Sequence, residues 1–184
     1  MDLLIAGLVM MIGIHLVPAV VPVRSGLIKR MGETAYKAVF SVVALAGLVL
    51  IIYGKSRAEF VALWNPPVWG HYVTMVLMPF SILLLAAANM PSNIKRITPN
   101  PMLWGILLWS VAHLFANGDK ASLLLFGCFG LYAVVGLITV NRRGQAIRQE
   151  KLHMSKDVIL IVASIIGVVA LSAFHGQLFG VAIM

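Results

Sequence analysis

Blocks of continuous apolar residues dominate this sequence, and each block is close to the length of a membrane-spanning helix. A helix needs roughly 20 apolar residues to cross the hydrocarbon core of a bilayer. The blocks do not alternate apolar and polar residues, which excludes the pattern of a membrane β-barrel. The predicted spans are Leu3–Val21, Tyr36–Tyr53, His71–Ala88, Met102–Ala116, Ser122–Val140 and Val158–Phe174. We therefore expect an all-α, polytopic transmembrane helix bundle of about six spans, forming a single domain over residues 1–184.

The composition supports the same class of protein. Hydrophobic residues make up 61% of the chain and charged residues only 11%, whereas about a quarter of the residues in soluble domains are charged. No segment is long and polar enough to form a separate soluble domain, so the lipid bilayer is the expected partner. Met1–Val21 lacks the positively charged N-terminal region with which a signal peptide begins. We therefore expect a retained helix there rather than a signal peptide.

The basic residues predict the orientation of the chain and argue against a nucleic-acid partner. The formal net charge is +8, but the Lys and Arg residues lie in loops between apolar spans, as membrane orientation requires. Eleven of them fall at the first, third and fifth loops: Arg24, Lys29, Arg30, Lys37, Lys95, Arg96, Arg142, Arg143, Arg148, Lys151 and Lys156. The second and fourth loops, on the opposite side of the membrane, carry Lys55, Arg57 and Lys120. The odd loops are therefore expected in the cytoplasm and both termini outside.

The second loop, GKSRAEFVALWNPPVWGHY, is rich in large apolar side chains around Pro66 and Pro67. Tryptophans at the boundary of a bilayer usually form an interfacial belt. An amphipathic segment lying on the outer surface is therefore the favoured interpretation, and a lid over a pocket between helices is the alternative.

Histidines inside membrane spans are costly and are functional candidates by default. His153 lies in the basic fifth loop, and His71 and His175 stand at helix ends, where an interfacial role is favoured. His15 shares a helical stripe with Gly7. The stripe is either a packing face or an axial-ligand site in which the glycine makes room for a flat cofactor.

His113 lies near the end of the shortest predicted span. That span covers about 22 Å at the α-helical rise, less than the roughly 30 Å core. The turn Asn117–Asp119 is therefore expected below the outer surface, where loop backbone is tolerated only against protein or a wet cavity. His15 and His113 differ by about 5 Å in depth when counted from the cytoplasmic ends of their helices, which helix tilt can absorb.

Three stretches together resemble the NnrU family of bacterial membrane proteins. They are GIHLVPAVVPVRSGLIKRMGETAYKAVFS (13–41), WGHYVTMVLMPFSILLLAAAN (69–89) and RITPNPMLWGILLWSVAHLFANGD (96–119). The family is linked by name and genetic context to denitrification and nitric oxide metabolism. It is also similar to the plant zeta-carotene isomerase, a membrane enzyme that uses haem b for a redox-dependent isomerisation.

The resemblance implies that His15 and His113 match the haem-ligand positions of that enzyme. Arg24 and Glu33 also match the family pattern, and they are expected to brace the first loop or pair with a haem propionate. The alternative cysteine ligand of the enzyme falls at Ser110 here, so a thiolate cannot replace the histidine. A histidine common before Met-Leu-Trp-Gly is replaced by Asn100, and its role is not carried over.

The resulting expectation is a multi-pass protein of the bacterial inner membrane that binds haem b. His15 and His113 would bind the haem iron, with His71 as a reserve ligand, and Asn117 and Asp119 would orient the second ring nitrogen of a ligand. The expected role is redox or isomerase-like, on a lipophilic small molecule or a nitrogen oxide, with a respiratory-chain partner. Whether the protein is an enzyme is left open.

Two alternatives remain from the sequence. A non-haem metal site would draw on His71, His113 and His175, which this topology gathers near the outer face. A cofactor-free accessory protein would assist a respiratory nitrite or nitric oxide reductase. Its histidines would then make hydrogen bonds between helices.

Overall fold

The computed structural model describes the backbone of residues 1–142 and 146–180 and the side chains of residues 1–139 and 146–180. Arg143, which counts among the basic residues of the fifth loop, lies outside the described residues, as does the side chain of Arg142. The regular elements within the described part are all helices. The chain divides into two compact units, Met1–Val61 and Ala62–Met184, which are described separately.

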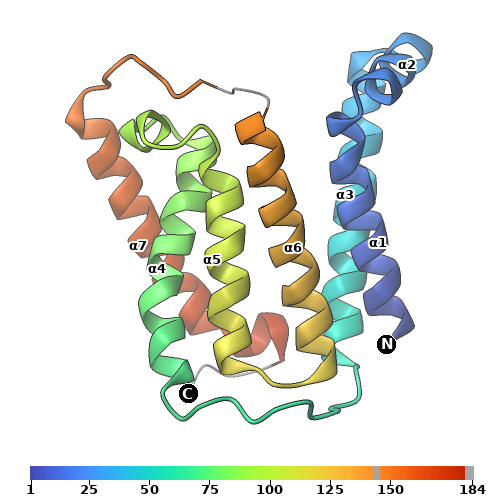
Figure 1. Cartoon of the computed structure of the whole chain (residues 1–184), viewed down its shortest axis with the longest axis vertical. Helices are drawn as coiled ribbons and strands as arrows, with labels where there is room; N and C mark the ends of the chain where they lie inside the picture. Colours follow the sequence, from blue (N-terminus) through green and yellow to red (C-terminus); the bar gives the residue numbers. More distant parts are fainter. Residues whose placement is uncertain (143–145, 181–184) are drawn as a thin grey trace. The chain divides into compact units, whose positions relative to one another are not determined.

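The unit Met1–Val61 is built on two long helices packed side by side (Figure 1). Its elements are α1 (Asp2–Leu16), η1 (Val17–Ala19), α2 (Val21–Met31) and α3 (Glu33–Ser56). A Cβ atom at Gly7 would lie 2.7 Å from the backbone nitrogen of Ile51 and 2.8 Å from the carbonyl oxygen of Gly47, both on α3. Gly7 therefore lets two helices approach closely, as in other membrane helix pairs. It makes room for α3 rather than for a cofactor.

The chain between α1 and α3 differs from the loop that the sequence predicts. The first helix gives way to a 3-10 turn at Val17, because Pro18 has no N–H to continue the α-helical pattern. Pro22 then occupies the first turn of α2, a position that proline favours. Gly32, with a φ of +82°, ends α2 in a conformation that residues with a side chain rarely adopt. The predicted loop is thus largely a short helix.

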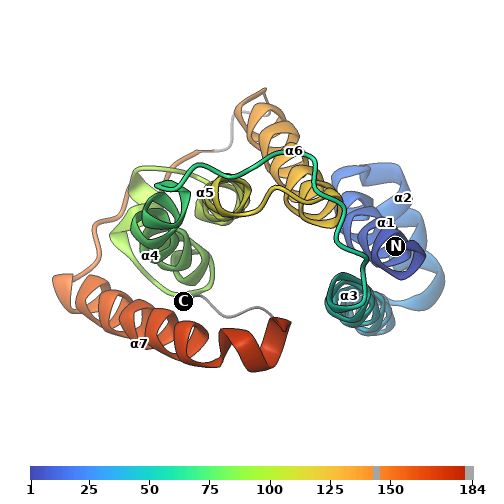
Figure 2. The ribbon, with the colours of Figure 1, turned by 90° about the horizontal axis from the view of Figure 1, so that it is seen from below.

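The unit Ala62–Met184 contains four long helices in a row. Its elements are α4 (Gly70–Asn89), η2 (Asn93–Arg96), α5 (Pro101–Ala116), α6 (Lys120–Arg142) and α7 (Met154–Phe179). Viewed end-on in Figure 2, α4 lies between α5 and α7, and α5 lies between α4 and α6. The hydroxyl of Ser81, fully buried, donates to the carbonyl of Gly105 across the α4–α5 contact (2.8 Å). The hydroxyl of Thr74 donates to the carbonyl of Ala112 (2.6 Å).

The helices confirm the predicted fold class. Within the described residues, five helices are long and apolar enough to cross a membrane, and the shorter apolar helix is α5, at Pro101–Ala116. Five of the predicted spans each lie on one of these helices, with ends that differ by a few residues. The first, Leu3–Val21, covers α1 and the 3-10 turn and reaches Val21, the first residue of α2. The largest extension is in α7, which is 26 residues long and ends at Phe179 rather than Phe174.

A polar clamp attaches the start of α7 to the α4–α5 connection, at the end of the unit opposite the α5–α6 turn (Figure 1). The backbone N–H and the side-chain amide of Asn93 donate to the carboxylate of Asp157 (2.8 and 2.5 Å). The same amide donates to the carbonyl of Leu152 (3.0 Å), whose N–H donates back to the Asn93 side-chain oxygen (2.9 Å). The side chain of Asn93 therefore joins the α4–α5 connection to the segment at the start of α7, which lies 59 or more residues later in the chain.

Replacing Asn93 by alanine should loosen α7. The substitution removes three side-chain hydrogen bonds, one of them to a carboxylate, and we expect a loss of about 2–4 kcal/mol in the free energy of unfolding. Thermal unfolding in detergent and protease cleavage within 146–153 measure the effect. Asn89→Ala is the matched control, because the amide of Asn89 is exposed and makes one long bond of 3.5 Å. Equal stability of the two variants would show that the clamp does not hold α7.

Candidate functional site

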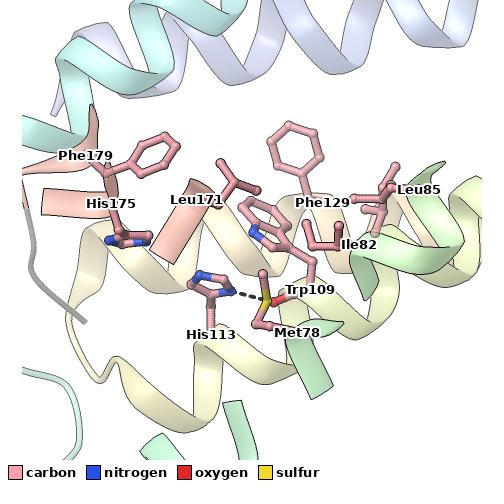
Figure 3. A pocket seen from close by; sticks show the side chains of 10 residues that line it. Met78, Ile82, Leu85, Trp109, His113, Phe129, Leu171, His175 and Phe179 are labelled. Atoms are coloured by element: carbon pink, nitrogen blue, oxygen red, sulfur yellow. Dashed lines mark hydrogen bonds between the residues drawn. The ribbon is translucent and has the colours of Figure 1, made fainter. Parts of the chain in front are cut away.

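A cavity of about 270 Å³, partly open to the outside, lies among the four long helices of the unit Ala62–Met184 (Figure 3). Side chains from all four helices line it: Met78, Ile82, Leu85, Ile106, Trp109, His113, Phe129, Leu171, His175 and Phe179. Most of these side chains are apolar, and only His113, His175 and Trp109 carry a nitrogen atom. Apolar pockets with a few placed polar groups are typical ligand sites.

His113 is held in a fixed orientation within this cavity. Its Nδ1–H donates to the carbonyl oxygen of Trp109, one turn earlier on α5 (2.8 Å). The ring stacks on Phe126 of α6, with ring centres 4.5 Å apart. Its second nitrogen, Nε2, points into the cavity (Figure 3). A metal-binding histidine characteristically donates its other N–H to a backbone carbonyl or a carboxylate, which leaves one lone pair for the metal.

An aromatic cluster supports this orientation from α5 and α6. The ring of Trp109 lies 4.9 Å from Phe126 and 5.5 Å from Phe129, with the edge of one ring toward the face of the other. These are preferred aromatic geometries, and each pair contributes about 0.5–1.5 kcal/mol beyond its buried area. Ile106, Trp109 and His113, which helical spacing places on one face of α5, all line this cavity.

His175 shares the cavity with His113, although the sequence favours an interfacial role for it. Its half-buried ring lies within electrostatic range of His113. A signal for this placement was present in the sequence, because Leu171, His175 and Phe179 are spaced four residues apart on one face of α7. All three line the cavity.

The Asn117–Asp119 turn is largely buried against protein, and its depth in a bilayer stays a prediction. Gly118 is buried, and Asp119 is 4% exposed. The carboxylate of Asp119 accepts hydrogen bonds from the N–H (2.9 Å) and the hydroxyl of Ser122. Through these bonds Asp119 caps the start of α6. The Asn117 amide donates to the backbone carbonyl of His113 (2.9 Å). The hydrogen bond of the His113 ring goes to Trp109.

Part of the second loop covers this turn. The N–H groups of Leu63 and Trp64 both donate to the carbonyl of Gly118 (2.8 and 3.1 Å), and Ala62 forms a bridge with Asp119. Beyond this contact the large side chains of the loop are exposed, up to 91% for Val68. Exposed apolar side chains fit the favoured interfacial interpretation, which stays a prediction.

His15 lies in the other unit, near the end of α1, and repeats the local geometry of His113. Its Nδ1–H donates to the carbonyl of Met11, one turn earlier (2.7 Å). Its half-buried ring meets the ring of Phe40 edge-on, with centres 5.0 Å apart. The relative placement of the two units is not determined, so the convergence of His15 and His113 stays a prediction.

The remaining candidate residues lie at exposed positions. Arg24 is exposed on α2, within electrostatic range of Glu33, which forms an ion pair with Lys37 (2.7 Å). His71 is exposed in the first turn of α4. In the part of the chain that the structure describes, no group of three or more His, Cys, Asp or Glu side chains is placed to hold a metal ion.

Long apolar helices around a histidine-lined cavity define a multi-pass helical membrane protein. The chain belongs to the NnrU protein family, whose family model matches residues 3–183 of 184. This match confirms the family resemblance and extends it beyond α5 to the C-terminal helices. No curated protein and no solved structure matches the chain.

Proposed function

We propose that this protein binds haem b in the bacterial inner membrane, with His113 as an axial ligand of the iron. The family resemblance implies His15 as the second ligand. The proposed role is redox or isomerase-like chemistry linked to nitrogen-oxide metabolism, on a lipophilic molecule or a nitrogen oxide, in contact with the respiratory chain. The support for this role comes from the NnrU family, and the support for the cofactor comes from the two histidines.

The observation that carries the proposal is the hydrogen bond that each of these histidines makes. In both rings Nδ1 donates to the carbonyl four residues earlier, at 2.7 Å for His15 and 2.8 Å for His113. A carbonyl oxygen only accepts, so Nδ1 carries the proton and Nε2 keeps the free lone pair. In this tautomer Nε2 can bind iron while Nδ1–H is held by the carbonyl, an arrangement that is common for metal-binding histidines.

The apolar lining of the cavity around His113 suits the faces of a porphyrin ring, and the charged propionates of haem would lie outside this lining. Aromatic and aliphatic side chains line the cavity, and Nε2 of His113 faces its interior. Its volume of about 270 Å³ lies just below the range of about 300–1,000 Å³ that is typical of ligand pockets. Haem iron needs only one or two protein ligands, so a haem site does not require a group of three metal-binding side chains.

The residues of the chain would hold and insulate such a group. His113 would bind iron through Nε2, with Trp109 and Phe126 fixing the angle of its ring. The apolar lining would limit the access of water to the bound group. Bound haem supplies electron transfer, with a potential set by its axial ligands and by the polarity of its surroundings.

The hydrogen bonds also bear on the alternative of a cofactor-free accessory protein. In that alternative the histidines would bond across helices. In the structure His15 and His113 bond to carbonyls of their own helices, and the described polar bonds between α4 and α5 come from Thr74 and Ser81. The histidines are therefore not needed for those bonds and remain oriented for a ligand.

The direct test is an absorption spectrum of the detergent-purified protein, oxidised and reduced. We expect a Soret band and, after reduction, the sharp visible bands of a haem with two nitrogen ligands. Extraction of the pigment should identify haem b. A protein that stays colourless after expression with added haem precursor, and that also fails to take up haem in vitro, would overturn the proposal.

A further inference from the structure

The cavity contains a second imidazole, whose position matters for anything bound to His113. His175 comes from α7, at the far end of the helix row from α6, yet it lines the same cavity as His113 of α5. The two rings are close enough to interact electrostatically. His175 is half-buried, and its ring packs against the ring of Phe179, with ring centres 5.0 Å apart.

The direction of the free nitrogen of His113 connects the two residues. Nδ1 is engaged with the carbonyl of Trp109. Figure 3 shows the other ring nitrogen turned toward His175, with the side chain of Leu171 nearby. An atom bound to that nitrogen therefore lies between the two rings. Of the remaining lining residues, Trp109 carries only an indole N–H, which donates and does not coordinate, and Met78 offers only a weakly basic thioether.

We propose that His175 binds the haem iron opposite His113, so that both axial nitrogens come from the unit Ala62–Met184. This inference rests on the proposed function and changes its second ligand from His15 to His175. The step is the coordination of two neutral imidazoles, and no electron or proton has to be supplied. The site needs no side chain from Met1–Val61, and the Asn93–Asp157 clamp holds α7 in place for it.

The assignment of His175 as the second ligand and the assignment of His15 make opposite predictions for single variants of the full chain. Removing the true second ligand leaves a five-coordinate, high-spin iron, whereas removing an uninvolved histidine leaves the six-coordinate, low-spin spectrum unchanged. We expect His175→Ala to convert most of the low-spin signal to high-spin in absorption and electron paramagnetic resonance spectra. We expect His15→Ala to keep it. Added imidazole should restore the low-spin spectrum of His175→Ala by entering the space left by the ring.

The matched control is His153→Asn, since His153 lies outside the cavity at the start of α7 and asparagine can keep its capping bond to Ser155. His175→Phe serves where the alanine variant does not fold, because it keeps a ring beside Phe179. A low-spin His175 variant together with a high-spin His15 variant would overturn this inference and leave the proposed function intact. A wild-type protein without haem would overturn the proposed function itself.

Discussion

Replacing His113 by alanine should weaken the binding of haem to the purified protein. The substitution deletes the nitrogen that faces the cavity, and no neighbouring residue on α5 can take its place, because Ser110 turns toward Gly130 of α6. We expect at least a tenfold weaker retention of haem, equivalent to about 1.4 kcal/mol or more. The ratio of Soret absorbance to protein absorbance after purification measures the loss.

His113→Phe separates the loss of the ligand from the loss of packing. The ring of His113 stacks on Phe126 and contacts Trp109, so alanine also leaves a gap in the aromatic cluster, which costs stability. Phenylalanine keeps a ring and removes both nitrogens. We expect His113→Phe to be folded, as judged by its unfolding temperature and elution volume, and to retain as little haem as His113→Ala.

Ser110→Ala is the matched control on the same helix. Ser110 is 1% exposed, and its hydroxyl makes no hydrogen bond. Removing an unpaired buried hydroxyl is neutral or slightly stabilising, and the haem content should equal that of the wild type. Full haem content in both His113 variants would contradict the assignment of this residue as a ligand.

The helices could be predicted from the sequence because their signal is local. Each span is a run of apolar residues close to membrane thickness, and α5 was correctly predicted to be the shortest. The stripe of Ile106, Trp109 and His113 follows from helical spacing alone. The short length of α5 led us to expect the turn after it to pack against protein, and Asp119 is buried there.

The contacts between these helices could not be predicted, because a local apolar pattern does not say which helices pack together. His175 shares a cavity with His113 only because α7 packs against α4, and α4 packs against α5. The sequence predicts only that His113 and His175 lie near the same outer face, as the non-haem alternative assumes. The role of Gly7 was ambiguous for the same reason, since a small residue suits both a neighbouring helix and a cofactor, and the structure places Ile51 of α3 there.

Replacing Gly118 by alanine should be among the most destabilising single changes in the unit Ala62–Met184. A Cβ atom at this position would collide with the carbonyl oxygen of Trp64 and lie 3.0 Å from the ring of Pro66. Both neighbours belong to the backbone or to a rigid ring, so they cannot move aside as a flexible side chain would. The carbonyl of Gly118 also accepts two hydrogen bonds from the same segment, at Leu63 and Trp64.

The expected loss is about 2–4 kcal/mol in the free energy of unfolding, because the added methyl group must separate the segment from the turn and leave buried backbone groups unpaired. The turn follows α5 directly, and its first residue, Asn117, donates to the carbonyl of His113 four residues earlier. Haem retention should therefore fall together with stability. Thermal unfolding in detergent, followed with and without added haem, measures both effects.

Gly127→Ala is the matched control, since it adds the same methyl group to α6, nine residues further along the chain. A Cβ atom there would meet only the side chain of Leu123, at an ordinary contact distance of 3.7 Å. Alanine is also favoured over glycine within a helix by about 0.5–1 kcal/mol, so this variant should unfold at the same temperature as the wild type or slightly higher. If Gly118→Ala behaved in the same way as Gly127→Ala, the contact between Trp64 and Gly118 would not be what fixes the end of α5, and the orientation of His113 would depend on the aromatic cluster alone.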